Sequence, residues 1–143
     1  MRKLVAMLSF AGVAVFALAA VSFADARSTG WSASLTAADV IPKQAVKNAH
    51  ANGSFSATLS GYELTFKLSF SQLSGPATGA NLGYGAKGKA GRITVSLCSP
   101  CQSTVNTGVG LDRSLIKALK QHLLFVVVRT AKNPNGEIRG QIA

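Results

Sequence analysis

Alternation of polar and apolar residues marks several segments of the chain as β-strands. Residues 53–60 alternate apolar side chains with serine and threonine, and residues 62–70 repeat the pattern with larger side chains. The Ser60-Gly61 step between them is typical of a tight turn, so the two runs predict a β-hairpin with one buried face. Shorter or weaker runs predict further strands, at residues 31–35, 77–84, 92–98, 123–129 and 137–142.

One short helix interrupts the predicted strands. Asp112 is a favourable N-cap residue, and the apolar residues between positions 115 and 119 are spaced for one helical face. Residues 37–52 and 99–110 are expected to form loops. Strands do not alternate with long helices, which argues against a parallel sheet. The pattern therefore predicts an all-β fold, an antiparallel β-sandwich with one short helix.

The N-terminal segment has the pattern of a secretory signal peptide. Two basic residues precede an apolar run over residues 4–21, and small residues follow at positions suited to cleavage after Ala24 or Ala26. An uncleaved membrane anchor is the alternative, because the apolar run is longer than in most signal peptides. We expect residues 1–26 to be a signal peptide, residues 27–143 to be the folded domain, and the protein to be secreted or periplasmic.

The chain is strongly basic, with 15 Lys and Arg against 5 Asp and Glu, and a formal net charge of +10. Such a charge favours anionic partners. The basic residues are scattered and form no run of five, so a soluble basic protein without a dedicated site is the simpler interpretation. The closest cluster, Lys87, Lys89 and Arg92, lies in a glycine-rich segment and is the candidate anion-binding loop.

Two cysteines, Cys98 and Cys101, form the sequence Cys-Ser-Pro-Cys. The sequence has no second such pair and no suitably spaced histidines to complete a zinc site. The residues after Cys101 do not predict the helix that a thioredoxin-like redox centre requires. A disulfide formed in an oxidising compartment is the favoured interpretation, and its short ring is expected to stiffen a loop more than it stabilises the fold.

The chain closes on a turn and a final strand. The sequence NPNG at residues 133–136 predicts a hairpin connection, and Glu137, Arg139 and Gln141 then share one face of the strand. A structural ion pair that fixes the strand register is the favoured interpretation, with Arg129 as a further partner of Glu137 across the hairpin. A catalytic carboxylate is the alternative, but no second catalytic group lies nearby in the sequence.

The closing residues NPNGEIRGQI resemble the closing motif of CHRD domains, which were first noted in chordin. Other segments follow in the order of that family: WSASL at residues 31–35, the hairpin of residues 53–70, and LSGPAT at residues 73–78. The resemblance covers nearly all of residues 27–143. It implies a Greek-key β-sandwich of the immunoglobulin or superoxide-dismutase type, and an interaction module rather than an enzyme.

Three positions depart from the pattern of many bacterial CHRD domains. Those domains carry His-x-His after the LSGP turn and a further histidine before the closing motif, whereas this chain has Asn81, Gly83 and Arg129 at the matching positions. The remaining histidines, His50 and His122, have no metal-ligand spacing. We therefore expect no metal, no cofactor and no catalytic residues, with a degenerate metal-binding domain as an alternative.

The expected function is that of a secreted or periplasmic binding or structural module. Its partner is expected to be an unknown protein or an anionic polymer. No specific nucleic-acid binding is expected, because aromatic residues do not interleave with the basic ones. The membrane is a partner only if the N-terminal segment stays uncleaved.

Overall fold

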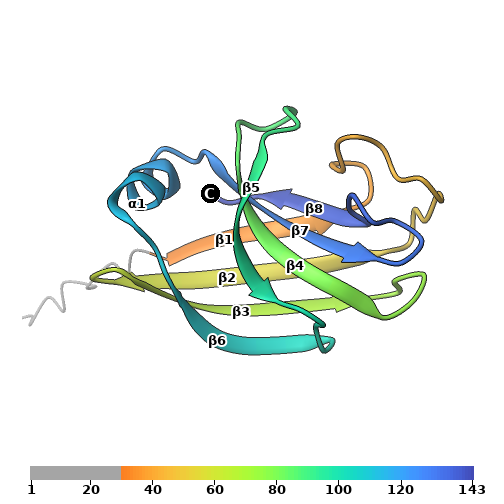
Figure 1. Cartoon of the computed structure of the whole chain (residues 1–143), viewed down its shortest axis with the longest axis horizontal. Coiled ribbons are helices and arrows are strands. Elements are labelled where there is room, and N and C mark those ends of the chain that lie inside the picture. Colours follow the sequence, from red (N-terminus) through yellow and green to blue (C-terminus); the bar gives the residue numbers. More distant parts are fainter. Residues whose placement is uncertain (1–29) are drawn as a thin grey trace, which may run out of the picture.

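The computed structural model describes residues 30–143, which form eight strands and one helix (Figure 1). The expected signal peptide lies outside the described residues. The elements are β1 (Gly30–Thr36), β2 (Asn52–Ser60), β3 (Glu63–Ser71), β4 (Ala77–Tyr84), β5 (Arg92–Cys98), β6 (Thr104–Gly110), α1 (Arg113–Lys120), β7 (Leu124–Thr130) and β8 (Ile138–Gln141). The prediction of an all-β fold with one short helix is confirmed. In this part of the chain, no helix is long and apolar enough to cross a membrane.

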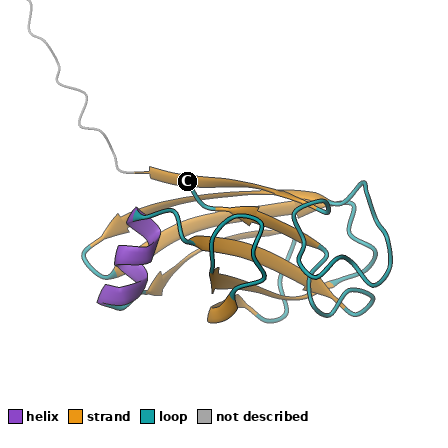
Figure 2. Ribbon diagram, turned by 90° about the horizontal axis from the view of Figure 1, so that it is seen from above, coloured by secondary structure: helices purple, strands orange, loops and turns teal. Residues whose placement is uncertain are grey.

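All eight strands belong to one antiparallel sheet, in the order β5-β4-β7-β8-β1-β2-β3-β6. The sheet curves until its two halves face each other, as Figures 1 and 2 show, and a nearly closed barrel results. β5 and β6 are the two edges of the sheet, and within residues 30–143 no pairing joins them. The Greek-key sandwich of two separate sheets is therefore not confirmed.

The main core fills the space between the facing halves of the sheet. Phe55 and Phe66, from the predicted hairpin, stack with ring centroids 5.7 Å apart and are each 2% exposed. Val126 and Val128 on β7 are fully buried against them in the same core cluster. β7 is buried on both faces, which explains its nearly continuous apolar sequence.

β6 lies within residues 99–110, which the sequence pattern assigned to a loop, so that assignment was wrong. β6 pairs with β3 over seven residues. Only Val105 and Val109 on β6 approach the core, and the other five residues are exposed. An edge strand with so few inward side chains does not need the alternation by which buried strands are recognised.

A second, smaller apolar layer covers the outer face of the sheet. Phe125 and Val127 on β7 point away from the main core but are at most 3% exposed. Val127 meets Val40 beside Gly136, so the segment between β1 and β2 folds over this face. The ring of Phe125 lies directly over Gly83, where an added Cβ would overlap it.

β1 and β8 connect the two halves of the sheet. Thr36 pairs with Arg139, and Ser32 and Ala143 exchange two backbone hydrogen bonds of 2.9 Å each. An added Cβ at Gly140 would overlap the backbone of Ser34, so the glycine permits this close approach. The start of the first strand and the last residue of the chain therefore lie side by side.

Candidate functional site

Glu137 is completely buried, and its carboxylate is surrounded by hydrogen-bond donors. It accepts a hydrogen bond from the backbone N–H of Ser74 at 2.8 Å and another from the Ser74 hydroxyl. Asn133 Nδ2 donates at 2.8 Å and Thr130 Oγ1 at 3.2 Å. Burial raises the pKa of Glu137, but the bonds from Ser74, Asn133 and Thr130 outweigh it, so the net pKa is lowered. This arrangement makes the charged carboxylate an anchor for two turns.

Arg139 is 3% exposed and fastens a different loop. Its guanidinium lies 3.6 Å from the centroid of the Phe125 ring and donates hydrogen bonds to the backbone carbonyls of Lys89 and Ala90. Burial lowers the pKa of this guanidinium, while the charge of Asp39 acts in the opposite direction. Arg139 thereby holds the loop between β4 and β5 against the outer face of the sheet.

The expected ion pair among Arg129, Glu137 and Arg139 is not formed. The hydrogen bonds of Glu137 come from Ser74, Asn133 and Thr130, and those of Arg139 go to carbonyl groups. The β7–β8 register, continued by one residue, places Glu137 opposite Arg129, but the Glu137 side chain turns toward Ser74. Arg129 extends over its β4 neighbour Gly79, and its Nε finds no hydrogen-bond partner among residues 30–143.

Gln141 completes the set of anchors in the closing motif. Its Nε2 donates to the carbonyls of Gly85 at 2.9 Å and His122 at 2.8 Å. The first of these carbonyls begins the β4–β5 loop, and the second lies between α1 and β7. Glu137, Arg139 and Gln141 thus tie the end of the chain to three loops, which lie between β3 and β4, between β4 and β5, and between α1 and β7.

The residues of the predicted anion-binding loop do not share one of the hollows found among residues 30–143. Lys87 lines a small cavity of about 140 Å³ together with Asp39 and Arg139. Lys89 is exposed, and its carbonyl is held by Arg139. Arg92 lines a different hollow, with its guanidinium 5.2 Å from the centroid of the Tyr84 ring.

Cys98 and Cys101 form a disulfide, with sulfur atoms 2.01 Å apart and Cα atoms 5.2 Å apart. The bridge lies in the connection between the two edge strands β5 and β6. The backbone N–H of Cys101 donates to the carbonyl of Ala77 at 3.1 Å, which ties this connection to β4.

The outer face of the sheet holds Asn81, Gly83 and Arg129, the three positions at which the sequence departs from the histidine pattern that the resemblance implied. Asn81 pairs with Val127 on β7, and Gly83 pairs with Phe125. Within the described part of the chain, Asn81 Nδ2 makes one long bond of 3.5 Å to a β5 carbonyl, and the buried Asn81 Oδ1 has no partner. Residues 30–143 contain no group of three His, Cys, Asp or Glu side chains placed to hold a metal. His50 and His122 are exposed on different connections.

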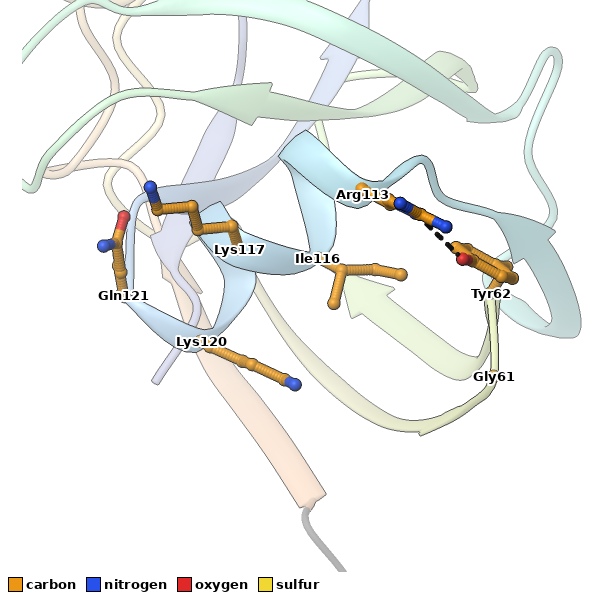
Figure 3. Close-up of a pocket in the computed structure, with 7 residues that line it drawn as sticks. All are labelled: Gly61, Tyr62, Arg113, Ile116, Lys117, Lys120 and Gln121. Atoms are coloured by element: carbon orange, nitrogen blue, oxygen red, sulfur yellow. Dashed lines mark hydrogen bonds between the residues drawn. The ribbon is translucent and has the colours of Figure 1, made fainter.

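A groove of about 700 Å³ lies between α1 and the turn that joins β2 to β3 (Figure 3). Asp112 caps the helix, because its carboxylate accepts a hydrogen bond of 2.8 Å from the Leu115 N–H. Ala118 and Leu119 are buried in the end of the barrel, which leaves the opposite face of α1 exposed. The groove is lined by Gly61, Tyr62, Arg113, Ile116, Lys117, Lys120 and Gln121.

Three cations follow one another along this groove. Arg113, Lys117 and Lys120 are separated by four and three residues, so they lie on neighbouring positions of the helix surface. Arg113 Nε donates to the hydroxyl of Tyr62 at 3.1 Å, and the Tyr62 side chain is 55% exposed. Figure 3 shows Arg113, Ile116 and Lys120 beside the space between the helix and the turn.

Among residues 30–143, no carboxylate lines this groove. The nearest acidic residues in sequence are engaged elsewhere: Asp112 accepts hydrogen bonds from Ser114 and Leu115, and the Glu63 carboxylate lies beside Gly108 on β6. These hydrogen bonds lower the pKa of Asp112, and the bond from the Ser114 hydroxyl has the largest effect. The cations therefore create a local excess of positive charge.

A second hollow, of about 270 Å³, lies on the other side of α1. Tyr84 and Arg92 form one wall of this hollow, and residues of α1 form the other. Lys117 and Gln121 line both hollows. Together the two hollows form a basic surface around the helix.

A comparison with known protein families matches residues 31–142 to the CHRD domain. The chain belongs to the CHRD domain family. No curated protein and no solved structure matches the chain. The CHRD match includes the closing motif, α1 and every strand except the first residue of β1.

The groove of this CHRD domain was missed by sequence reasoning, although the sequence contained a signal. The spacing of Arg113, Lys117 and Lys120 indicates one basic helical face, but the basic residues were interpreted as scattered. The alternation over residues 62–70 predicts that Tyr62, its first apolar position, lies on the buried face of the hairpin, but the Tyr62 side chain is 55% exposed. It precedes β3 in the turn and follows Gly61, whose φ is 60°, so its ring projects into solvent.

Proposed function

We propose that this CHRD domain is a non-catalytic binding module for an anionic polymer, and that the α1 groove is its binding site. The observation that carries the proposal is the line of Arg113, Lys117 and Lys120 in a groove that no carboxylate lines within residues 30–143. Clefts lined by charge of one sign attract ligands of the opposite sign. The apolar side chain of Ile116 and the exposed ring of Tyr62 add contact area beside the cations.

The closing motif supports this assignment indirectly. Glu137, Arg139 and Gln141 are occupied by internal hydrogen bonds, so they serve to hold the fold. The face that corresponds to the histidines of many relatives is filled by the Phe125 ring and the segment that contains Val40. The exposed basic surface around α1 is the better candidate for recognition.

The test is a charge reversal in the groove with a matched reversal elsewhere. The groove variant is Lys117→Glu/Lys120→Glu, and the control is Lys43→Glu/Lys47→Glu, which changes the same number of exposed lysines between β1 and β2. Binding of each full-length protein to fluorescent polygalacturonate is measured at several salt concentrations, with neutral dextran as a further control.

We expect the groove variant to weaken binding at least tenfold, and the control variant to weaken it less than twofold. Wild-type affinity is expected to fall steeply with salt, because the contacts lie at the surface and are screened. Equal loss in the two variants would show that only net charge matters, and would contradict a binding site at α1.

We further propose that the protein is exported and that residues 1–26 are removed. The basic n-region, the apolar run and the small residues before Ala24 and Ala26 support this. The disulfide between Cys98 and Cys101 is compatible with an oxidising compartment. Intact mass of the protein recovered outside the cytoplasm would reveal the new N-terminus, and retention of residues 1–26 would contradict removal.

A further inference from the structure

We propose that the anionic polymer is a chain of acidic sugars which passes over Lys117 and occupies the hollows on both sides of α1. This inference rests on the proposed function and adds the class of ligand and its path. The ligand class is a polysaccharide that carries carboxylates on its sugar rings.

The path follows from the residues that the two hollows share. Lys117 and Gln121 line both the groove of about 700 Å³ and the hollow of about 270 Å³. Lys117 on α1 and Gln121 directly after it are both exposed, so no buried wall separates the hollows at this point. A ligand longer than one hollow can therefore continue across the helix and gain contacts with Arg92.

Each hollow is lined by an exposed tyrosine and an arginine that lies beside it. In the first, Arg113 Nε lies 3.1 Å from the Tyr62 hydroxyl. In the second, the Arg92 guanidinium lies 5.2 Å from the centroid of the Tyr84 ring, and Tyr84 is 39% exposed. A tyrosine and an arginine thus lie together on both sides of the helix, joined through the hydroxyl in one pair and over the ring in the other.

This pairing fits a ligand unit whose apolar ring face and negative charge are adjacent. An acidic sugar meets that requirement, because its carboxylate is bonded directly to the ring and the ring carbons present a face of C–H groups. A tyrosine ring offers the complementary apolar surface, and arginine binds carboxylates through two parallel donors. In a nucleotide the phosphate is separated from the base by the sugar, so one Tyr–Arg pair fits it less well.

The shape of the surface favours a chain over a lipid bilayer. The cations line hollows on both sides of a projecting helix, with Lys117 between them. A flat surface would meet the helix and leave Arg92 and Arg113 on opposite sides of the contact. A flexible chain can follow the surface from one hollow to the other.

The experiment compares short and long oligogalacturonates on the full-length protein. Affinities of a trimer and a twelve-residue oligomer are measured for wild type, for Lys117→Gln, and for Tyr84→Ala/Arg92→Gln. We expect the long oligomer to bind wild type at least tenfold more tightly than the trimer. In Tyr84→Ala/Arg92→Gln, the affinity for the long oligomer should fall at least fivefold and the affinity for the trimer less than twofold. Lys117→Gln should lower the affinity for both oligomers.

The outcomes separate this inference from the function on which it rests. Absence of binding to every acidic polymer would overturn the proposed function itself. Binding that is independent of length, or unchanged in Tyr84→Ala/Arg92→Gln, would overturn only the path across the helix. Tighter binding of a single-stranded oligodeoxynucleotide of equal charge, or of vesicles of phosphatidylglycerol, would overturn the acidic-sugar assignment. Urea unfolding of each variant ensures that only folded proteins are compared.

Discussion

Glu137 holds Ser74, a residue 63 positions earlier in the chain, through both the backbone N–H and the hydroxyl of that serine. The same carboxylate accepts hydrogen bonds from the side chains of Asn133 and Thr130, which belong to the β7–β8 hairpin. One buried charge therefore joins the turn before β4 to the turn before β8. The polar face of the last strand, which the sequence presents as a possible site, forms part of the internal frame of the fold.

Replacing Glu137 by Gln is expected to destabilise the protein strongly. The amide would present donors to a site that already contains four, so buried N–H and O–H groups would lose their acceptor. We expect the free energy of unfolding to fall by about 2–3 kcal/mol, measured by urea denaturation. Ser74→Ala is the matched variant, because it removes the hydroxyl but keeps the backbone N–H, and a loss of about 1 kcal/mol is expected. Equal stability of wild type and Glu137→Gln would contradict the anchor.

Acid should weaken this anchor over a defined range of pH. The pKa of Glu137 is lowered in the folded state from its ordinary value of 4.5, so the unfolded state takes up the proton first as pH falls. The stabilisation is complete above pH 4.5 and is lost as pH falls below that value through the folded-state pKa. Asp112, whose pKa is also lowered, acts in the same direction.

The contribution of Glu137 can be isolated by subtraction. The difference in free energy of unfolding between wild type and Glu137→Gln is measured by urea denaturation between pH 7 and pH 3, and Asp112 contributes equally to both proteins. We expect the difference to be constant above about pH 5 and to shrink toward pH 3. A difference that stays constant over the whole range would refute the lowered pKa.

Gly83→Ala is expected to disturb the outer apolar layer. The added Cβ would overlap the ring of Phe125, which is fixed from the other side by the Arg139 guanidinium. Forcing an extra methyl group into a filled site costs about 1–3 kcal/mol, to be measured as the loss in free energy of unfolding. Gly75→Ala is the control, because no atom lies within 4 Å of its added Cβ, and a change below about 0.5 kcal/mol is expected.

The sequence predicts the strands whose side chains face the main core. The hairpin over residues 53–70 and the central strand β7 were recognisable, because their buried positions must be apolar at a fixed period. The start of α1 was also recognisable, since Asp112 satisfies a backbone N–H that the helix leaves unpaired. β6 lacked such a signal, because an edge strand buries little of its surface.

The roles of the charged residues depended on partners that are remote in sequence. Glu137 and Arg129 are placed symmetrically about a turn, which suggested an ion pair, but the donors to Glu137 include Ser74 from a distant turn. The carbonyl partners of Arg139 leave no trace in the sequence, because every residue has a carbonyl group. The basic groove required the fold as well, because the pairing of β3 with β6, a strand that the sequence pattern missed, brings Tyr62 beside the start of α1.

The exchange of hydrogen bonds between Ser32 and Ala143 determines how the domain would respond to mechanical force. A pull applied between Gly30 and Ala143 acts at neighbouring ends of adjacent antiparallel strands, perpendicular to their length. The hydrogen bonds between β1 and β8 would then break one after another, because only the bond nearest the pulled ends carries the force at any moment. Because these two strands connect the halves of the sheet, their separation would open the barrel along a line opposite the gap between β5 and β6.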